Sequence, residues 1–415
     1  MTITARKATW LASLGAGLEY YDFIVYGMMV SYLNTLFFVS GEAWIDLMKG
    51  FAVFAVGYLA RPFGGLLFGM IGDTFGRKET FVFIMLLMAI ATFAVGLLPT
   101  YAQMGMTAAV LLIALRLLQG LSFGAELPGA ITVVNEYADP KKTSIHSGFV
   151  ISSVSLGSIL ASLILFILSK NIDKQQILDW GWRIPFLLGG LLALANYFIR
   201  KHLQETPAFA NLQSRRPSAI LREPLIQLWK NHRLMLAIGI SMTVLVASLV
   251  IFNLYLPTYL SLHFQYQMPD IYLAMTYGLI WSAISLPICG FLADRFGRMK
   301  IFLFTCIAFG LIVFPLFHLL TFGGMGALTI FMMVYQTAIS FLMASYFPLL
   351  AAGFPVQVRY TGIALCYNFV YAIMGSAPIA ITFLIEKTNT PTAAIWFLIA
   401  CAAISIAGIL GKHLK

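Results

Sequence analysis

A series of apolar stretches of 20 or more residues recurs from Trp10 to Leu410 and constrains this chain more than any other feature. Each stretch is long enough to cross about 30 Å of hydrocarbon as a helix that rises about 1.5 Å per residue. Only 10% of the 415 residues are charged, against roughly 25% in soluble domains, so a water-soluble globule of this size would lack polar surface. The chain is therefore predicted to be an all-α membrane protein.

Twelve transmembrane helices are predicted from the apolar content, in two groups of six. They cover residues 9–37, 48–71, 79–98, 105–137, 146–168, 182–200, 234–262, 270–292, 301–320, 325–350, 360–384 and 391–411. The first six form an N-terminal bundle over residues 1–200, and the last six form a C-terminal bundle over residues 234–415. Residues 201–233 are the most polar stretch and are predicted to be a cytoplasmic linker.

The lysines and arginines predict the orientation, because short cytoplasmic loops retain positive charge during insertion. With the N-terminus inside, 19 of the 26 basic residues lie on the cytoplasmic side and five in outer loops. Both termini are therefore expected in the cytoplasm, with the spans in a bacterial inner membrane. The orientation accounts for the basic excess, a net charge of +10, without an acidic partner. No nucleic-acid partner is expected, because the basic residues form no face interleaved with aromatic residues.

One short motif occurs at the same place in both halves. GLLFGMIGDTFGRK (65–78) ends the second span, LPICGFLADRFGRMK (286–300) ends the eighth, and aligning Asp73 with Asp294 gives an offset of 221 residues. Glycine permits a tight turn, and the aspartate and arginine can pair or cap helix ends at the membrane surface. Duplicated halves place a substrate site between them at the midplane. A conformational gate is expected at these loops, formed by Gly72, Asp73, Gly76, Arg77, Glu136, Asp294 and Arg298.

The repeated loop resembles the hallmark of the major facilitator superfamily. Four further stretches resemble its metabolite:proton symporter family: GLEYYDFIVYG (17–27), RLLQGLSFGAELPGA (116–130), QETPAF (204–209) and VRYTGIALCYN (358–368). The resemblance implies two pseudo-symmetric six-helix bundles that work by alternating access. It also implies proton symport of a metabolite such as citrate, a dicarboxylate, shikimate, proline or betaine, without naming which.

Five ionisable residues lie inside predicted spans, where a charge costs on the order of 3 kcal/mol or more and marks function. They are Glu19, Asp22, Arg61, Arg116 and Glu126. Asp22 and Arg116 are expected to pair, and the resemblance implies proton coupling at an acidic residue of helix 1 opposite the helix-4 arginine. One alternative is a permanent salt bridge that only joins these helices, and another is Glu126 as the proton carrier. Glu19, on the same helix face as Asp22, is expected to pair with Arg61.

The substrate site is expected at the same depth in the membrane as these ionisable residues. Arg61 and Arg116 can hold a carboxylate, and Tyr26 lies roughly a turn beyond Asp22 on helix 1. The C-terminal half offers neutral polar groups that can form hydrogen bonds with a cargo. These are Asn253, Tyr335, Gln336, Tyr367, Asn368 and Tyr371.

The sequence thus predicts a secondary transporter that symports a small organic acid or zwitterion with protons. Its expected partners are the cargo, protons and membrane lipids; it is expected to act as a monomer, powered by the proton gradient without any cofactor. The alternative is a proton-independent facilitator or exchanger of the same substrates. An enzyme is not expected, because the sequence shows no nucleophile paired with a base, no metal-ligand cluster and no glycine-rich phosphate loop with its lysine.

Overall fold

The computed structural model describes residues 5–38, 42–75, 77–124, 127, 128, 131, 134, 138–201 and 222–410, and this part of the chain is helical without strands. The N-terminal half comprises α1 (Ala5–Phe37), α2 (Ala43–Phe75), α3 (Arg77–Leu97), α4 (Tyr101–Met104), α5 (Met106–Phe123), α7 (Thr143–Asn171), α8 (Lys174–Gln176), a π-helical turn (Ile177–Gly181) and α9 (Arg183–Lys201). The C-terminal half comprises α11 (Arg222–Asn231), α12 (Arg233–His263), α13 (Met268–Phe296), α14 (Arg298–Leu319), a 3-10 turn (Leu320–Phe322), α15 (Gly324–Gly353), α16 (Val356–Met374), α17 (Ala377–Thr388) and α18 (Ala393–Leu410).

Every one of the twelve predicted spans contains a helix. Within the described residues, nine helical spans are long and apolar enough to cross a membrane, or ten if the bent pair Lys174–Gly181 and Arg183–Ala195 counts as one. The eleventh predicted span is interrupted, because α16 ends at Met374 and α17 begins at Ala377. The prediction of an all-α membrane protein is confirmed. The division into two bundles at the linker stays a prediction.

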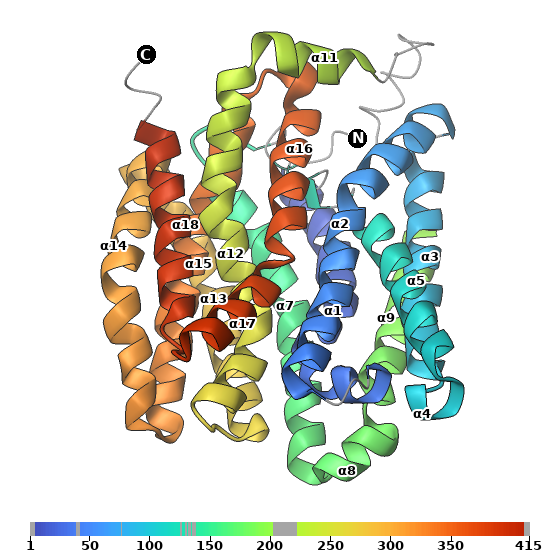
Figure 1. The fold of residues 1–415 in the computed structure, drawn as a ribbon. Coiled ribbons are helices and arrows are strands. Elements are labelled where there is room, and N and C mark those ends of the chain that lie inside the picture. Colours follow the sequence, from blue (N-terminus) through green and yellow to red (C-terminus); the bar gives the residue numbers. More distant parts are fainter. Residues whose placement is uncertain are drawn as a thin grey trace.

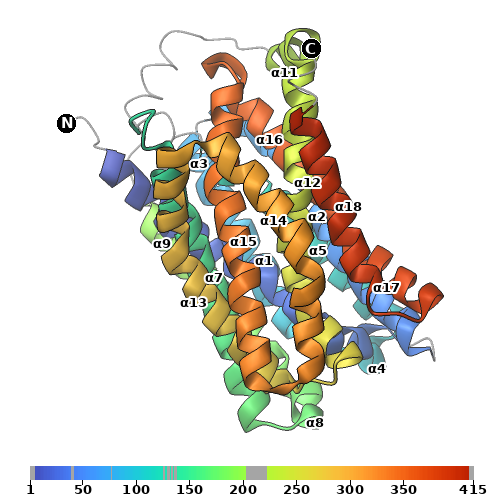
Figure 2. The same cartoon turned by 90° about the vertical axis from the view of Figure 1, so that its left-hand side faces the viewer.

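The long helices run side by side and reverse direction at each connection (Figures 1 and 2). α1 begins and α18 ends at one end of the molecule, called here the termini end, and α11 lies across it (Figure 1). The short helices α4 and α8 lie at the opposite end. The two halves meet where α7 packs along α13, α1 on α12 and α2 on α16. Side chains on these helices therefore meet between the halves.

The second copy of the repeated loop forms the tight turn that its glycine predicts. Gly297 separates α13 from α14 and has a φ of +98°, a region that other residues rarely adopt. In the first copy, α2 ends at Phe75 and α3 begins at Arg77, and the intervening Gly76 lies outside the described residues.

Candidate functional site

Arg61 is 1% exposed on α2, and its guanidinium lies among four aromatic rings. Its Cζ is 4.7 Å from the ring centroid of Phe123, 5.0 Å from that of Tyr367, and 5.2 Å from those of Tyr58 and Tyr371. All four distances lie within the roughly 6 Å over which a ring face attracts a cation. We call these four rings the aromatic cage.

Both halves of the molecule supply the cage. Tyr58 and Phe123 come from α2 and α5, whereas Tyr367 and Tyr371 come from α16. Tyr58 stands three residues before Arg61, and Tyr367 stands four before Tyr371, spacings that put each pair on one helix face. The Tyr58 ring stacks on that of Tyr371 across the boundary, with centroids 6.3 Å apart. Arg61 therefore contacts rings of both halves.

The expected ion pair between Asp22 and Arg116 is not formed. Both side chains are 0% exposed, but neither oxygen of the Asp22 carboxylate has a hydrogen-bond partner among the described residues. Arg116 instead donates to Oε1 of Gln119 at 2.8 Å and lies 4.3 Å from the centroid of the Tyr26 ring. Gln119 is three residues along the same helix, so its amide reaches the guanidinium without crossing between helices. The alternative of a permanent Asp22–Arg116 salt bridge is wrong for the same reason.

Two hydrogen-bonded side chains, Gln119 and Thr92, lead from Arg116 toward Asp22, and we call them the polar chain. Nε2 of Gln119 donates to Oγ1 of Thr92 on α3 at 2.9 Å. A Cβ built on Gly189 of α9 would lie against Oδ1 of Asp22 and 3.1 Å from Cγ2 of Thr92. Asp22 and Thr92 thus border the same space, which exists because residue 189 has no side chain. Sequence reasoning missed Gln119 and Thr92, although the spacing of Gln119 from Arg116 was a usable signal.

The neutral polar residues divide into separate groups. Nε2 of Gln336 donates to Oδ1 of Asn253 at 3.1 Å inside the C-terminal half. Nδ2 of Asn368 donates to the carbonyl of Gly124 at 2.8 Å, which joins the two halves. Oδ1 of Asn368 and the hydroxyl of Tyr371 are buried without a hydrogen-bond partner among the described residues. The structure therefore brings Tyr367, Asn368 and Tyr371 to the boundary between the halves.

Tyr26 and Tyr335 donate their hydroxyl hydrogens to backbone carbonyls. The hydroxyl of Tyr26 donates to the carbonyl of Gly50 at 3.2 Å, and its ring stacks on Phe54. Tyr335 donates to the carbonyl of Leu249 at 2.8 Å within the C-terminal half. Tyr26 is therefore fixed beneath Arg116, whereas Tyr335 packs away from the cage residues.

Several predicted residues lie outside what the structure describes. Glu126, Glu136 and Gly76 are not among the described residues, and the side chains of Glu19, Gly72, Asp73 and Arg77 are not described. The expected pair of Glu19 with Arg61, the role of Glu126 and the first copy of the gate loop therefore stay predictions.

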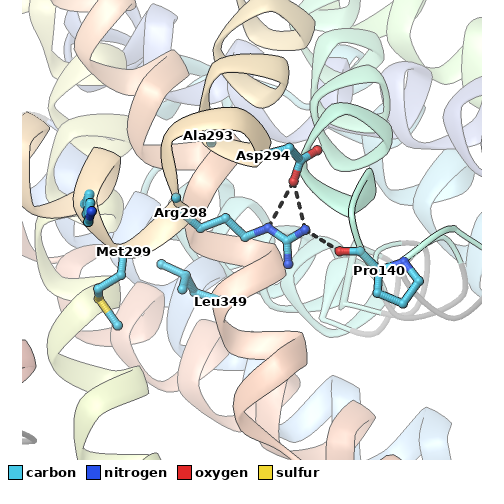
Figure 3. Close-up of a pocket in the computed structure, with 8 residues that line it drawn as sticks. Pro140, Ala293, Asp294, Arg298, Met299 and Leu349 are labelled. Carbon is cyan, nitrogen blue, oxygen red and sulfur yellow. Dashed lines mark hydrogen bonds and ion pairs between the residues drawn. The ribbon is translucent and has the colours of Figure 1, made fainter.

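The second copy of the gate loop joins the halves at the termini end. The carboxylate of Asp294 accepts hydrogen bonds from the backbone N–H groups of Ser144 at 3.2 Å and Ile145 at 3.1 Å, in the first turn of α7. Arg298 forms an ion pair with Asp294 at 2.8 Å and donates to the carbonyl of Pro140 at 2.6 Å (Figure 3). These groups border a surface pocket of about 470 Å³.

The halves also touch toward the opposite end. The hydroxyl of Tyr272 on α13 donates to the carbonyl of Met28 on α1 at 2.9 Å. The hydroxyls of Ser162 on α7 and Thr276 on α13 are 2.9 Å apart. Among the described residues the halves therefore touch at the termini end and toward the opposite end, and Arg61 is buried between them.

Comparison with known proteins identifies relatives along the whole chain. Residues 12–378 match the Major Facilitator Superfamily. The chain is 30% identical to the proline/betaine transporter of Escherichia coli (strain K12), with 99% of this chain and 83% of that relative covered. It is 33% identical to a putative proline/betaine transporter of Staphylococcus aureus (strain MSSA476), covering 99% and 89%.

Solved structures show the same fold. The partially occluded inward-open xylose transporter XylE from E. coli matches with a TM-score of 0.79 at 16% identity, over 99% of this chain and 98% of that one. A crystal structure of a D-xylose-proton symporter matches with a TM-score of 0.76 at 16% identity, over 97% and 95%. The chain therefore belongs to the Major Facilitator Superfamily and is a multi-pass membrane transporter of small molecules rather than an enzyme.

Proposed function

We propose that this transporter carries a small zwitterion of the proline or betaine type together with protons. The observation that carries the proposal is the Arg61 site, where rings that attract a cation surround a guanidinium that can hold a carboxylate. A zwitterion has both of these charges. The printed names of the relatives point to the same cargo, at 30% and 33% identity over nearly the full chain.

Asp22 is the proposed proton carrier. An ionised carboxylate that is buried without a partner is costly, so Asp22 is proposed to hold its proton while it is enclosed in this way. The polar chain from Thr92 through Gln119 ends at Arg116. A shift of Arg116 from Gln119 toward Asp22 would offer the carboxylate a cation and favour release of the proton. Glu126 remains the second candidate for this role.

The proposed setting is a bacterial inner membrane with both termini in the cytoplasm, as the distribution of basic residues favours. The termini end is then the cytoplasmic end. The proton gradient drives uptake without a cofactor, lipids surround the bundle, and one chain contains both halves of the site, so a monomer suffices.

Uptake by liposomes that contain the purified protein tests the proposal. With an alkaline interior, labelled proline or glycine betaine should accumulate above the external concentration, and a protonophore should abolish the excess. Methyl esters of the same compounds should not compete, because they lack the carboxylate that Arg61 is proposed to hold. Protein-free liposomes are the control. Equilibration without accumulation, with or without the pH gradient, would instead identify a facilitator or exchanger.

A further inference from the structure

We infer that the aromatic cage is the subsite for the cationic head of the cargo, and that Arg61 occupies it whenever the carrier is empty. The inference rests on the proposed function, because it names which part of the zwitterion each group of the site binds. The cargo class is a methylated or ring-bound ammonium joined to a carboxylate. Arg61 acts as a tethered stand-in for the ammonium.

The cage is suited to such a cation. Four ring centroids lie 4.7 to 5.2 Å from the guanidinium carbon, and the cage tyrosines and Arg61 are buried. A guanidinium and a methylated ammonium both have spread charge and weak hydration, so ring faces compensate either one for the loss of water. A carboxylate would face the negative side of each ring. The cage therefore selects the positive end of a zwitterion.

Exchange of the two cations keeps a cation in the cage and gives the cargo carboxylate a partner. When the ammonium head enters the cage, the displaced guanidinium remains tethered to α2 beside it and can bind the cargo carboxylate through two parallel hydrogen bonds. The hydroxyl of Tyr371 and Oδ1 of Asn368, which have no partner among the described residues, are a donor and an acceptor for the same cargo. Proline needs such an acceptor, because its ammonium keeps N–H groups.

The source of the rings gives the exchange a role in transport. Tyr58 and Phe123 belong to the N-terminal half, and Tyr367 and Tyr371 to the C-terminal half. A cation between them draws the halves together whether it is the guanidinium or the cargo. The empty carrier and the loaded carrier can therefore both reach the occluded state, which a transporter needs in order to return after release.

Binding to the purified full-length protein in detergent, measured by calorimetry, tests the cage without transport. The first probes are glycine betaine and 3,3-dimethylbutanoate, which have the same shape and carboxylate but differ in the central atom of the head, a charged nitrogen or a neutral carbon. Glycine betaine should bind at least about tenfold tighter, as a desolvated cation–π site implies. Equal affinity would overturn the cage as a cation subsite.

The second probe is tetramethylammonium, a cation without a carboxylate. Its affinity for Arg61→Gln should be at least about tenfold higher than for the wild type, because the variant has no guanidinium to fill the cage. A purely structural role for Arg61 predicts no such gain. The gain should disappear in Arg61→Gln with Tyr367→Leu. It should persist in Arg61→Gln with Tyr259→Leu, a control that removes an equally large buried ring, which packs against Phe252 and Phe317.

The outcomes separate this inference from the proposed function. If folded Arg61→Gln binds tetramethylammonium no better than the wild type, the stand-in role of Arg61 is wrong, whatever the liposomes show. If the gain is seen but no zwitterion accumulates in liposomes under a pH gradient, the cage stands and the proposed symport is wrong. Melting curves of each variant establish that it is folded before binding is compared.

Discussion

Asp22 is enclosed beside α3 and α9, and neither of its carboxylate oxygens has a hydrogen-bond partner among the described residues. Asp22→Asn should therefore change stability little, by about 1 kcal/mol or less, because no ion pair is lost. The same change should abolish accumulation driven by a pH gradient and spare exchange of cargo between the two sides, because the amide cannot release a proton. Gradient-driven uptake and counterflow at matched protein amounts measure the two activities.

Glu126→Gln is the companion variant in that experiment. Loss of accumulation in Glu126→Gln with normal accumulation in Asp22→Asn would transfer the proton role to Glu126. Accumulation in both variants would assign it to another group.

Gly189 leaves the space into which the Asp22 carboxylate projects. Gly189→Ala would place a methyl group against Oδ1 of Asp22 and 2.9 Å from the Tyr21 ring. We expect a destabilisation of about 1 to 3 kcal/mol from overpacking, together with impaired coupling. Gly310→Ala on α14 is the matched control, because a Cβ there would meet no atom within 4 Å beyond its adjacent residues and its own helix backbone. Thermal melting of both variants checks the prediction, and equal melting temperatures would contradict it.

At the scale of elements, α7 depends on the other half of the molecule for its N-terminal cap. Lys142, at the N-cap position, provides no side-chain hydrogen bond. The carboxylate of Asp294 from α13 accepts hydrogen bonds from the first-turn N–H groups instead. A negative charge at this position also interacts favourably with the helix dipole. The contact is therefore a latch between helices of different halves, which opens when they separate.

Asp294→Asn weakens this latch by removing the charge that caps α7 and pairs with Arg298. We expect the external cargo concentration for half-maximal uptake to rise by up to about tenfold, because in the proposed orientation a smaller fraction of molecules is closed at the termini end and open to the outside. The internal repeat predicts the same effect for Asp73→Asn. Asp270→Asn, an exposed change at the other end of α13, is the control. An unchanged uptake curve for Asp294→Asn would show that the contact is no gate.

At the scale of the whole molecule, α7 and α13 touch at the termini end and again farther along both helices, so alternating access requires these contacts to open in turn. Replacing Ser162 and Thr276 by cysteine should allow a disulfide to lock the contact between them, because their hydroxyl oxygens are only 2.9 Å apart. Oxidation should then stop uptake, and a reductant should restore it. The single variant Ser162→Cys is the control, and the four native cysteines are buried. Full uptake with the cross-link complete would exclude separation at this contact.

The sequence alone determined the helices and their approximate bounds. In a membrane each helix must satisfy its backbone hydrogen bonds internally, so the length and apolar content of a local stretch suffice to place it. The same holds for the turn at Gly297, which depends only on neighbouring residues. Arg61, Arg116 and Asp22, which the sequence places inside spans, are buried in the structure.

Only the tertiary structure decided which groups those charges meet. Depth along a helix can be estimated from sequence to within several ångströms, but a hydrogen bond forms only near 3 Å and in one direction. Rotation of each helix about its axis is set by packing against its neighbours, which come from distant parts of the chain. Packing therefore turned Arg116 toward Gln119, closed rings of both halves around Arg61, and set Asp294 on the first turn of α7.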